Sequence, residues 1–292
     1  MSIAKASLGW FFANVCSALI NFLAVMYFSR KLGASAMGIY YLFFSMLMIF
    51  NFVSNGGLSS ATIKRLSEGE NQYKILAASL LLRTMYLAII SGAIISFRDQ
   101  LESYLGANLT IYLLLVLFLV QFSDLIREFL QGSYRVAASG FVDFIQQILK
   151  ISFQIILLGY GLFGLIWGLI LGVLFSIGFG ALVSRPKLGL PENRDFVSLF
   201  HFSKYSYGTN LGGIIYDWLG ILAIGYFLNS TMAGIYGVCW SLSSVFLLLG
   251  QSISSSLFPE VSSLNTKNKH EEISALFASS ISYAPFLSLP GF

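Results

Sequence analysis

Five polar residues in one otherwise apolar stretch are the strongest candidates for chemistry in this sequence. Their spacing is i, i+3, i+4, i+7 and i+11, and they are Asp143, Gln146, Gln147, Lys150 and Gln154. At about 100° per residue, this spacing places all five side chains on one face of a helix. Polar and charged groups among apolar neighbours are expected to face a cavity or a partner helix. The pattern therefore predicts a substrate or ion pathway along this face, with a seam of interhelical hydrogen bonds as the alternative.

Further candidates lie within other apolar stretches, and they are Asp217, Asn210, Arg83 and Asn14. Asp217 shares a helical face with Asn210 and with small residues, which leave room for a ligand or permit close packing. A carboxylate there can bind a proton or a cation, or it can pair with a base such as Arg83 or Lys150. Asn14 shares one face of the first apolar stretch with two other polar residues, which is a weaker indication of the same kind.

No arrangement of residues points to catalysis. The sequence lacks a phosphate-binding Walker loop, a nucleophile-elbow serine and a zinc-binding His-Glu-x-x-His pattern. Both cysteines fall inside apolar stretches, and neither histidine has partner ligands nearby in sequence. There is also no basic tail or arginine-rich patch of the kind that binds nucleic acid. We therefore expect no enzyme activity, no metal or other cofactor, and no nucleic-acid partner.

The composition indicates the environment of these helices. Of the 292 residues, 57% are hydrophobic and only 10% are charged, and the mean hydropathy is +0.78. Soluble domains carry about 25% charged residues, so this chain has too little polar surface for water. Only helices and closed barrels satisfy their backbone within a bilayer, and the long apolar runs lack the alternation of barrel strands. The sequence therefore predicts an all-α polytopic membrane protein.

The apolar runs predict about nine transmembrane helices, because a span needs about 20 residues. The expected spans are 8–28, 37–58, 75–97, 109–130, 140–159, 162–183, 205–228, 232–257 and 273–292. The one long loop should contain a short amphipathic helix at the cytoplasmic surface, starting at Pro191 and Glu192, with a plain structured loop as the alternative. The expected organisation is a six-helix N-terminal lobe (1–183), an interfacial linker (184–204) and an incomplete second lobe (205–292).

The distribution of Lys and Arg predicts the orientation. With the N-terminus in the cytoplasm, 12 of the 17 basic residues lie on the cytoplasmic side and 3 on the outer side. The other two, Arg83 and Lys150, lie within spans. Because basic residues accumulate on the cytoplasmic side, we expect a multi-pass protein of the cell membrane with a cytoplasmic N-terminus.

A repeated motif divides the chain into two similar parts. Met37-Gly38-Ile39-Tyr40 recurs 196 residues later as Ala233-Gly234-Ile235-Tyr236. A repeat of six spans enters the membrane in the same direction each time, and such parallel repeats pack about an axis along the membrane normal. Two copies of 196 residues would need more than the 292 present, so the second copy is expected to be incomplete and the chain to be part of a longer transporter.

These motifs resemble those of the polysaccharide flippases in the multidrug/oligosaccharidyl-lipid/polysaccharide exporter superfamily. Segment 30–40 resembles the first external loop of that family, 216–236 its seventh span and following loop, and 258–264 the proline-containing end of its eighth span. The resemblance implies a V of two six-helix lobes, which moves a lipid-linked oligosaccharide from the cytoplasmic to the outer leaflet.

The resemblance also implies roles for single residues. Arg83 and Lys150 would hold the diphosphate and sugars, and Asp217 lies where the family often has an aspartate. A proton or sodium gradient would drive the cycle, and no other cofactor is implied. Membrane lipids and glycan-assembly proteins are the further partners that it implies.

Two other functions remain open. A multidrug exporter of the same superfamily would share the fold, and an acidic pathway would favour it. Asp143 and Asp217 stand against Arg83 and Lys150, which does not decide between the two transporters. A membrane-embedded glycosyltransferase or polymerase would need a sizeable loop with acidic catalytic residues, and no expected outer loop is long enough. A transporter is therefore the favoured class.

Overall fold

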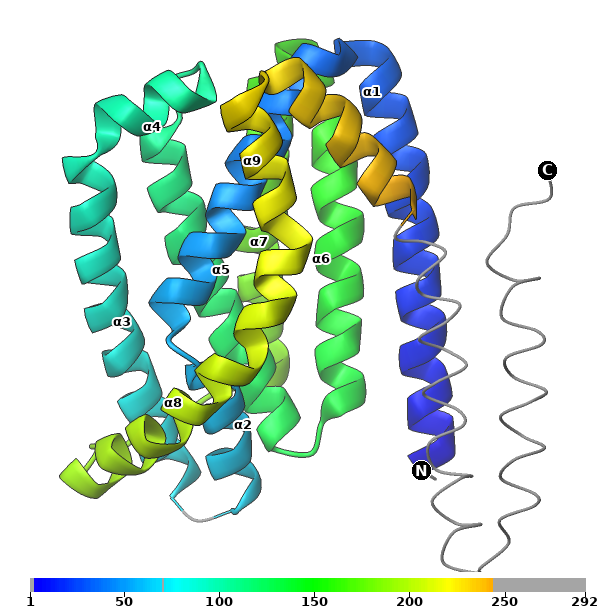
Figure 1. The fold of residues 1–292 in the computed structure, drawn as a ribbon. Coiled ribbons are helices and arrows are strands. Elements are labelled where there is room, and N and C mark those ends of the chain that lie inside the picture. The colour runs from blue at the N-terminus through cyan, green and yellow to red at the C-terminus, as the bar shows by residue number, and fades with distance from the viewer. Residues whose placement is uncertain (1–2, 70, 244–292) are drawn as a thin grey trace, which may run out of the picture.

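The computed structural model describes residues 3–69 and 71–243, with side chains described from residue 17 onward. Within these ranges the regular elements are helices (Figure 1). They are α1 (Ile3–Asn55), α2 (Leu58–Ser67), α3 (Gln72–Ser96), α4 (Arg98–Leu105), α5 (Thr110–Gly132), α6 (Val136–Ile156), a 3₁₀ turn (Leu158–Tyr160), α7 (Leu162–Ser184), α8 (Asn193–Ile214), a π turn (Ile215–Leu219) and α9 (Gly220–Phe227), followed by helical backbone over 230–243. The predicted all-α architecture is confirmed.

α1 combines the first two predicted spans in one element with a sharp break. At Gly33 the backbone has φ 76° and ψ 172°, a conformation that is open almost only to glycine. Residues 3–32 form a first arm, and residues 34–55 form a second arm that returns through the bundle (Figure 1). The break at Gly33 thus reverses the chain without a separate loop.

Four helices of the described residues are long and apolar enough to cross a membrane, or five if the bent pair α4–α5 counts as one span. The sequence predicts nine spans, and the difference has three sources. The two arms of α1 count as one helix, and the polar face of α6 lowers its hydropathy. In addition, the predicted span at 232–257 lies partly outside the described residues, and the one at 273–292 lies wholly outside them.

α4 is a short helix where the sequence predicts a loop between two spans. Its axis is bent by 98° from that of α5. Arg98 and Glu102 form an ion pair of 3.0 Å along α4, one turn apart. The hydroxyl of Tyr104 donates a hydrogen bond of 2.5 Å to the carbonyl oxygen of Leu222. α4 therefore joins α3 to α5 and also contacts α9.

α8, the π turn and α9 form one helical run of 35 residues. The sequence predicts a short interfacial helix and a separate span from residue 205, whereas the structure has no break in the helix at that point. The predicted helix start is confirmed: Glu192 and Asp195 form a reciprocal capping box at the N-terminus of α8. The first turns of α8 extend along one end of the bundle before the helix rises beside the second arm of α1 (Figure 1).

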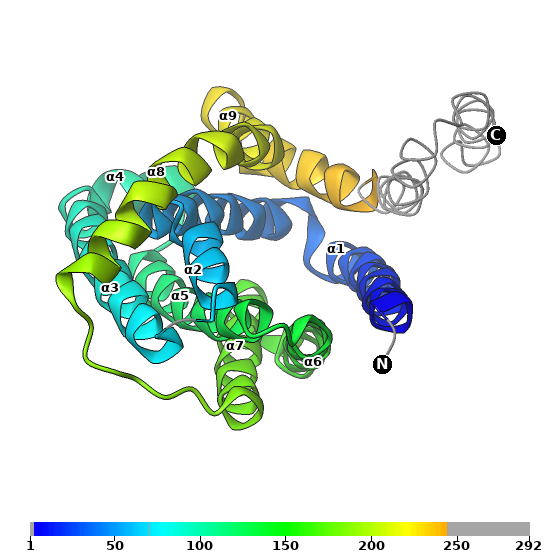
Figure 2. The ribbon, with the colours of Figure 1, turned by 90° about the horizontal axis from the view of Figure 1, so that it is seen from below.

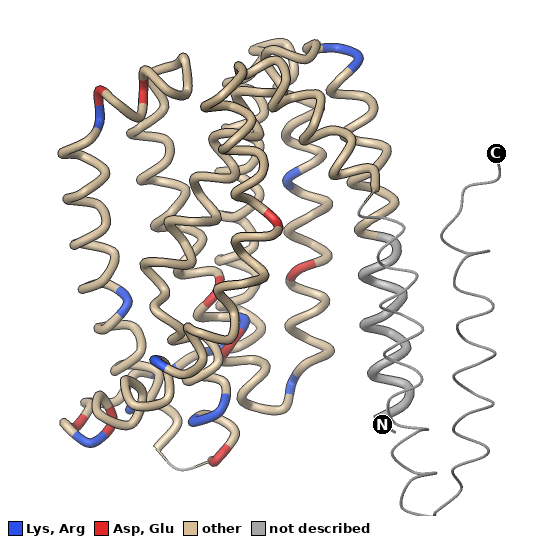
Figure 3. The backbone as a smooth tube through the Cα atoms, viewed as in Figure 1, with Lys and Arg blue, Asp and Glu red and all other residues tan. Residues whose placement is uncertain are grey.

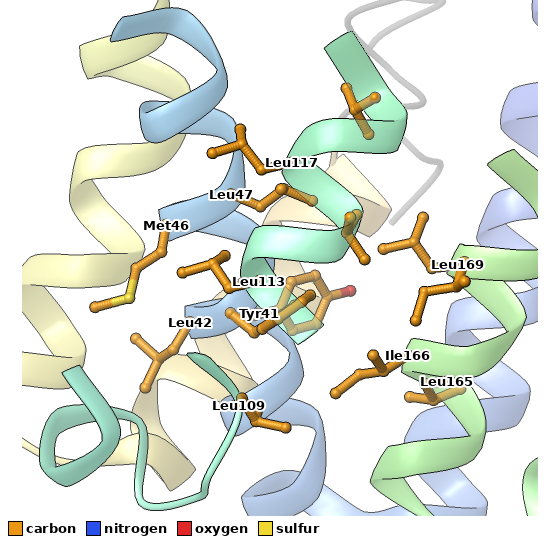
Figure 4. Close-up of a cluster of buried hydrophobic side chains, with 14 of the residues drawn as sticks. Tyr41, Leu42, Met46, Leu47, Leu109, Leu113, Leu117, Leu165, Ile166 and Leu169 are labelled. Carbon is orange, nitrogen blue, oxygen red and sulfur yellow. The ribbon is translucent and has the colours of Figure 1, made fainter. Parts of the chain in front are cut away.

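The core is built around the second arm of α1. Viewed from below, this arm lies between α8–α9 on one side and α5 and α7 on the other (Figure 2). Its buried side chains interdigitate with leucines and isoleucines of α5 and α7 (Figure 4). The most completely buried of them include Leu42, Leu47, Leu113, Leu117, Leu165 and Ile166. A second apolar cluster joins α2, α3, α5 and α8. These contacts hold the second arm as the central helix of the described bundle.

The two copies of the repeated motif touch each other at the end of the bundle where α1 breaks. A Cβ atom added to Gly38 would lie 1.7 Å from the carbonyl oxygen of Ser230, and one added to Gly234 would lie 2.1 Å from that of Ala34. Both segments are small-x-x-x-small pairs, which let helix backbones approach closely. Because Ala34 and Ser230 are also 196 residues apart, the contact is reciprocal, as between copies related by a two-fold axis. We call this contact the glycine crossing.

Candidate substrate pathway

Three glycines of α7 lie at its contact with α6, the helix that carries the polar face. Gly164, Gly168 and Gly172 are spaced four residues apart. Gly168 and Gly172 lie against the backbone of α6, and Gly164 lies against that of Leu157, directly after α6. A Cβ atom on Gly172 would lie 2.6 Å from the Cα atom of Lys150, and one on Gly168 would lie 2.6 Å from the backbone nitrogen of Gln154. α6 is therefore held tightly on α7, which fixes the direction of its polar face.

Four of the five polar residues on α6 have partners on other helices. Asp143 accepts a hydrogen bond of 2.6 Å from Arg127, and Gln146 accepts one of 3.1 Å from Ser123. The two remaining amides donate to α1. Gln147 reaches Asn21 on the first arm and Gln154 reaches Tyr40 on the second, each at 3.1 Å. For these four residues, the predicted seam of interhelical hydrogen bonds describes the structure.

Lys150 is the exception on this face. It lies on the same face three residues after Gln147 and four before Gln154, and its Cα atom packs against Gly172 of α7. Its side chain is half-buried, and it forms no hydrogen bond or ion pair with any residue in the described part of the chain. An ammonium group on a membrane helix without a protein partner has unused capacity for an anionic ligand.

Arg83, the other predicted basic pathway residue, is already paired. Its guanidinium lies 2.5 Å from a carboxylate oxygen of Glu128 and 3.4 Å from the amide oxygen of Gln121. Both charged side chains are almost wholly buried. The side chain of Glu128 turns between α2, α3 and α5, where Arg83 neutralises it and Ser59 donates a hydrogen bond to it.

Arg127 connects α5 to α6. It pairs with Asp124 on its own helix and with Asp143 on α6. Asn51 on the second arm of α1 also donates a hydrogen bond of 3.2 Å to Asp124. Asp143 is therefore part of a polar cluster that joins three helices, and its carboxylate is already committed to Arg127.

Asp217 and Asn210 lie on the other side of the second arm. Asp217 is exposed in the π turn, and it forms no ion pair or hydrogen bond with another residue in the part of the chain that the structure describes. π turns inside α-helices are often found at functional sites. Asn210 is also exposed and donates a hydrogen bond of 3.0 Å to the carbonyl oxygen of Ser206. The side chain of Asn14 lies outside the described residues. Asp217 and Asn210 are thus not joined to α6 by any contact that the structure describes.

Several partners of the candidate residues were not anticipated from the sequence. Tyr40, Ser123 and Gln121 each bond a predicted residue on a different helix. Tyr40 belongs to the repeated motif, which is a usable signal, but its pairing with Gln154 spans 114 positions. Spacing within one helix cannot reveal such long-range partners.

The backbone trace shows how charge is distributed over the molecule. Most Lys and Arg positions gather at the end that carries α2 and the start of α8, and few lie along the middle of the bundle (Figure 3). This separation agrees with a protein whose middle is embedded in hydrocarbon.

A family described as "Polysaccharide biosynthesis protein" matches residues 10–292. The chain is similar to the "Probable low-salt glycan biosynthesis flippase Agl15" of Haloferax volcanii, with 31% identity over all of this chain and 62% of the relative. It is also similar to the "Probable flippase AglR" of the same organism, with 27% identity over 99% of this chain and 61% of the relative. The chain thus spans about three fifths of the length of these relatives.

Solved structures share the fold. An inward-facing multidrug resistance MATE family transporter of the MOP superfamily superposes with a TM-score of 0.70 and 17% identity, covering 92% of this chain and 68% of that one. A MATE protein in the straight conformation superposes with a TM-score of 0.62 and 15% identity, covering 98% of this chain and 69% of that one. The chain is therefore a multi-pass membrane protein with the fold of this transporter superfamily.

Proposed function

Because the chain belongs to the polysaccharide biosynthesis protein family, we propose that it acts in the translocation of a lipid-linked oligosaccharide from the cytoplasmic to the outer leaflet of the cell membrane. The names of both archaeal relatives support a flippase. The proposed direction rests on a cytoplasmic N-terminus, for which the bias of basic residues is the support.

The observation that carries the proposal is the unpaired ammonium of Lys150. A lipid-linked sugar carries phosphate or diphosphate between its lipid and its glycan, and a cation at membrane depth can bind that group by charge-assisted hydrogen bonds. The neighbouring amides already bond Asn21 and Tyr40, so they hold α6 in place without competing for the ligand. Lys150 is the proposed anchor for the phosphate, and Arg83 is the counter-ion of Glu128.

Coupling to a proton or sodium gradient is part of the proposal. Asp217 is the acidic group that supports it, because Asp143 is engaged by Arg127 whereas Asp217 has no described charged partner. The proposed partners are the lipid-linked glycan, the surrounding lipids and proteins of glycan assembly.

A multidrug exporter is the second candidate, and the exposed carboxylate of Asp217 favours it, since a carboxylate attracts cationic drugs. The test that separates the two uses the chain reconstituted in liposomes with either of two fluorescent probes. We expect a lipid-linked oligosaccharide probe to become accessible to an impermeant quencher faster than in protein-free liposomes. Uptake of a cationic dye without movement of the glycan lipid would replace the flippase by the exporter.

A further inference from the structure

We infer that a cavity at one end of the bundle binds a phosphate group, either as a free anion or as part of a lipid headgroup. The cavity has a volume of about 420 Å³ and lies between the end of α2, the turn before α3 and the first turns of α8. We call it the α2–α8 cavity. Its polar lining residues are Arg65, Glu68, Asn71, Arg194, Asp195 and Ser198. None of its lining residues belongs to α6, and the inference does not rest on the proposed function.

The walls of the α2–α8 cavity are fixed by contacts around it. The capping box of Glu192 and Asp195 sets the first turn of α8, and Leu199, one turn later, is wholly buried in the second apolar cluster. On the opposite wall, the side-chain amide of Gln72 donates a hydrogen bond of 2.9 Å to the carbonyl oxygen of Leu66, which closes the turn between α2 and α3. The backbone of both walls is therefore in place, so binding of a ligand does not have to order it.

The two arginines have hydrogen-bond donors that no protein group uses. Arg65 holds both oxygens of Glu68 with Nη1, at 2.9 and 3.2 Å, whereas its Nε atom is buried and has no partner in the described part of the chain. A rotation of the guanidinium that presents Nε and Nη2 to one oxyanion would satisfy both donors. Arg194 pairs with Glu192 through Nε at 2.9 Å, and its terminal nitrogens form no bond with the described residues.

The acceptors of the cavity are already engaged. Both oxygens of Glu68 face Arg65, and Oδ2 of Asp195 accepts a hydrogen bond of 2.8 Å from the backbone N–H of Glu192. Two arginines face two carboxylates, so the net charge of the lining is zero and the free donors decide which ligand fits.

Two neutral donors add to the arginines. The side chains of Asn71 and Ser198 line the same cavity and form no hydrogen bond within the part of the chain that the structure describes. The unused donors of the cavity therefore match a ligand with several acceptor oxygens. Phosphate is such a ligand, and guanidinium groups bind it through two parallel hydrogen bonds.

The location of the cavity gives the phosphate two sources. The cavity lies at the end of the bundle where most Lys and Arg positions gather, as expected at the level of lipid headgroups (Figure 3). Beside it, the backbone N–H of Gly189 donates a hydrogen bond of 3.0 Å to the carbonyl oxygen of Tyr73. The segment held in this way presents Leu188 and Leu190 outward, 62% and 89% exposed. These leucines suit a lipid, whereas a free phosphate needs only the cavity.

Thermal unfolding of the whole chain in detergent tests the site and separates the two sources. The probes are dioctanoyl phosphatidic acid, dioctanoylglycerol, which lacks the phosphate, and inorganic phosphate compared with chloride at equal ionic strength. A ligand that binds only the folded chain raises the unfolding temperature, and we expect a rise of about 2–4 °C with a phosphate-bearing probe. A rise with phosphatidic acid alone assigns the site to a lipid headgroup, and a rise with inorganic phosphate shows that the phosphate group is sufficient. No rise with either, or an equal rise with dioctanoylglycerol, would overturn the inference.

Arg194→Gln and Ser198→Ala locate the effect in the cavity. Each substitution removes an unused donor, so each should reduce the rise to about half or less. Lys187→Gln is the matched control, because Lys187 is exposed at the same end of the bundle and does not line the cavity. An equal loss with Lys187→Gln would show that general surface charge holds the probe, and it would rule out the site.

Cysteine labelling covers the case in which these variants fail to fold. Ser198→Cys, in a chain that also carries Cys16→Ser and Cys239→Ser, places a thiol in the cavity wall. The probe that raises the unfolding temperature should slow its labelling about fivefold at about four times the Kd, because the bound fraction is shielded. Asn193→Cys is exposed at the start of α8 but lies outside the lining, so its labelling rate should not change. Equal protection of the two cysteines, or protection of neither, would contradict a phosphate site in this cavity.

Discussion

Arg83 and Glu128 form an ion pair of 2.5 Å inside the bundle, with side chains that are 3% and 6% exposed. The pair joins α3 to α5, and Ser59 of α2 donates a hydrogen bond to the second carboxylate oxygen. Two opposite charges that neutralise each other in an apolar interior are a structural feature, and either one left alone would be a buried, uncompensated charge. Arg83 is thus paired, whereas Lys150 forms no ion pair in the described part of the chain, and this difference leads to the first two predictions.

Removal of one member of this pair should destabilise the protein strongly. Arg83→Met is expected to cost about 3–5 kcal/mol, because it leaves the carboxylate of Glu128 unpaired. The double variant Arg83→Met, Glu128→Met should recover much of this loss. Thermal unfolding in detergent measures both. Arg98→Met is the control, since its side chain is half exposed and its pair with Glu102 should contribute less than about 1 kcal/mol. A double variant as unstable as the single one would contradict the assignment.

Lys150→Met should impair translocation without impairing folding. The substitution removes about 1.5–3 kcal/mol of charge-assisted binding, so the rate for the glycan lipid should fall by about tenfold or more. Folded protein, measured by size-exclusion chromatography, should stay within about twofold of the unmodified chain. Lys204→Met is the control because Lys204 is exposed on α8, outside the polar face. Activity that falls only in proportion to the amount of folded protein would remove Lys150 from the pathway.

The glycines of α7 offer a matched pair of substitutions. Gly172→Ala should lower the unfolding temperature by several degrees, because the new Cβ atom would lie 2.6 Å from the Cα atom of Lys150 and push α6 away. Gly178→Ala, in the same helix, meets nothing within 4 Å. It should leave the unfolding temperature unchanged or raise it slightly, since alanine favours the helix by up to about 1 kcal/mol. Equal shifts for both variants would show that the close approach of α6 and α7 does not stabilise the fold.

The orientation can be tested with single cysteines in the Cys16→Ser, Cys239→Ser background. Asn229 and Lys187 are both exposed and lie in different turns. With a cytoplasmic N-terminus, Asn229→Cys should react with an impermeant thiol reagent on intact cells, and Lys187→Cys should react only in inverted membrane vesicles. The reverse pattern would place the N-terminus outside and would reverse the proposed direction of transport.

The parts of the fold that follow from local composition could be predicted from the sequence. Long apolar runs identified α3, α5 and α7, and the spacing of polar residues identified the face of α6. The helix start at Glu192 was recognised from its proline and acidic residues. The continuity of α8 with α9 could not be predicted from the sequence. A long loop and the first turns of a helix that extends along the end of the bundle have similar compositions. The sequence predicts a loop between the first two spans, where the structure has a break at Gly33, because a single glycine does not indicate how short such a connection is.

The candidate site was predictable only in part, for the same reason. One helical face can be read from spacing, which is how Lys150 was found. Which of its neighbours are satisfied depends on residues far away in the chain, such as Asn21 for Gln147 and Tyr40 for Gln154. Arg83 and Lys150 looked alike in sequence because both are lone bases in apolar runs. The difference between them is Glu128, which lies 45 positions from Arg83.

A duplicated segment usually supplies two copies that can diverge independently. At the glycine crossing this freedom is lost, because each glycine lies against the backbone of the other copy. A larger residue at position 38 would clash with Ser230, and one at position 234 would clash with Ala34. A substitution in either copy therefore changes the packing of the other. The two positions should therefore evolve as one unit. Among related sequences, any enlargement at one of them should be accompanied by a compensating change across the crossing, while residues elsewhere in the two copies drift apart.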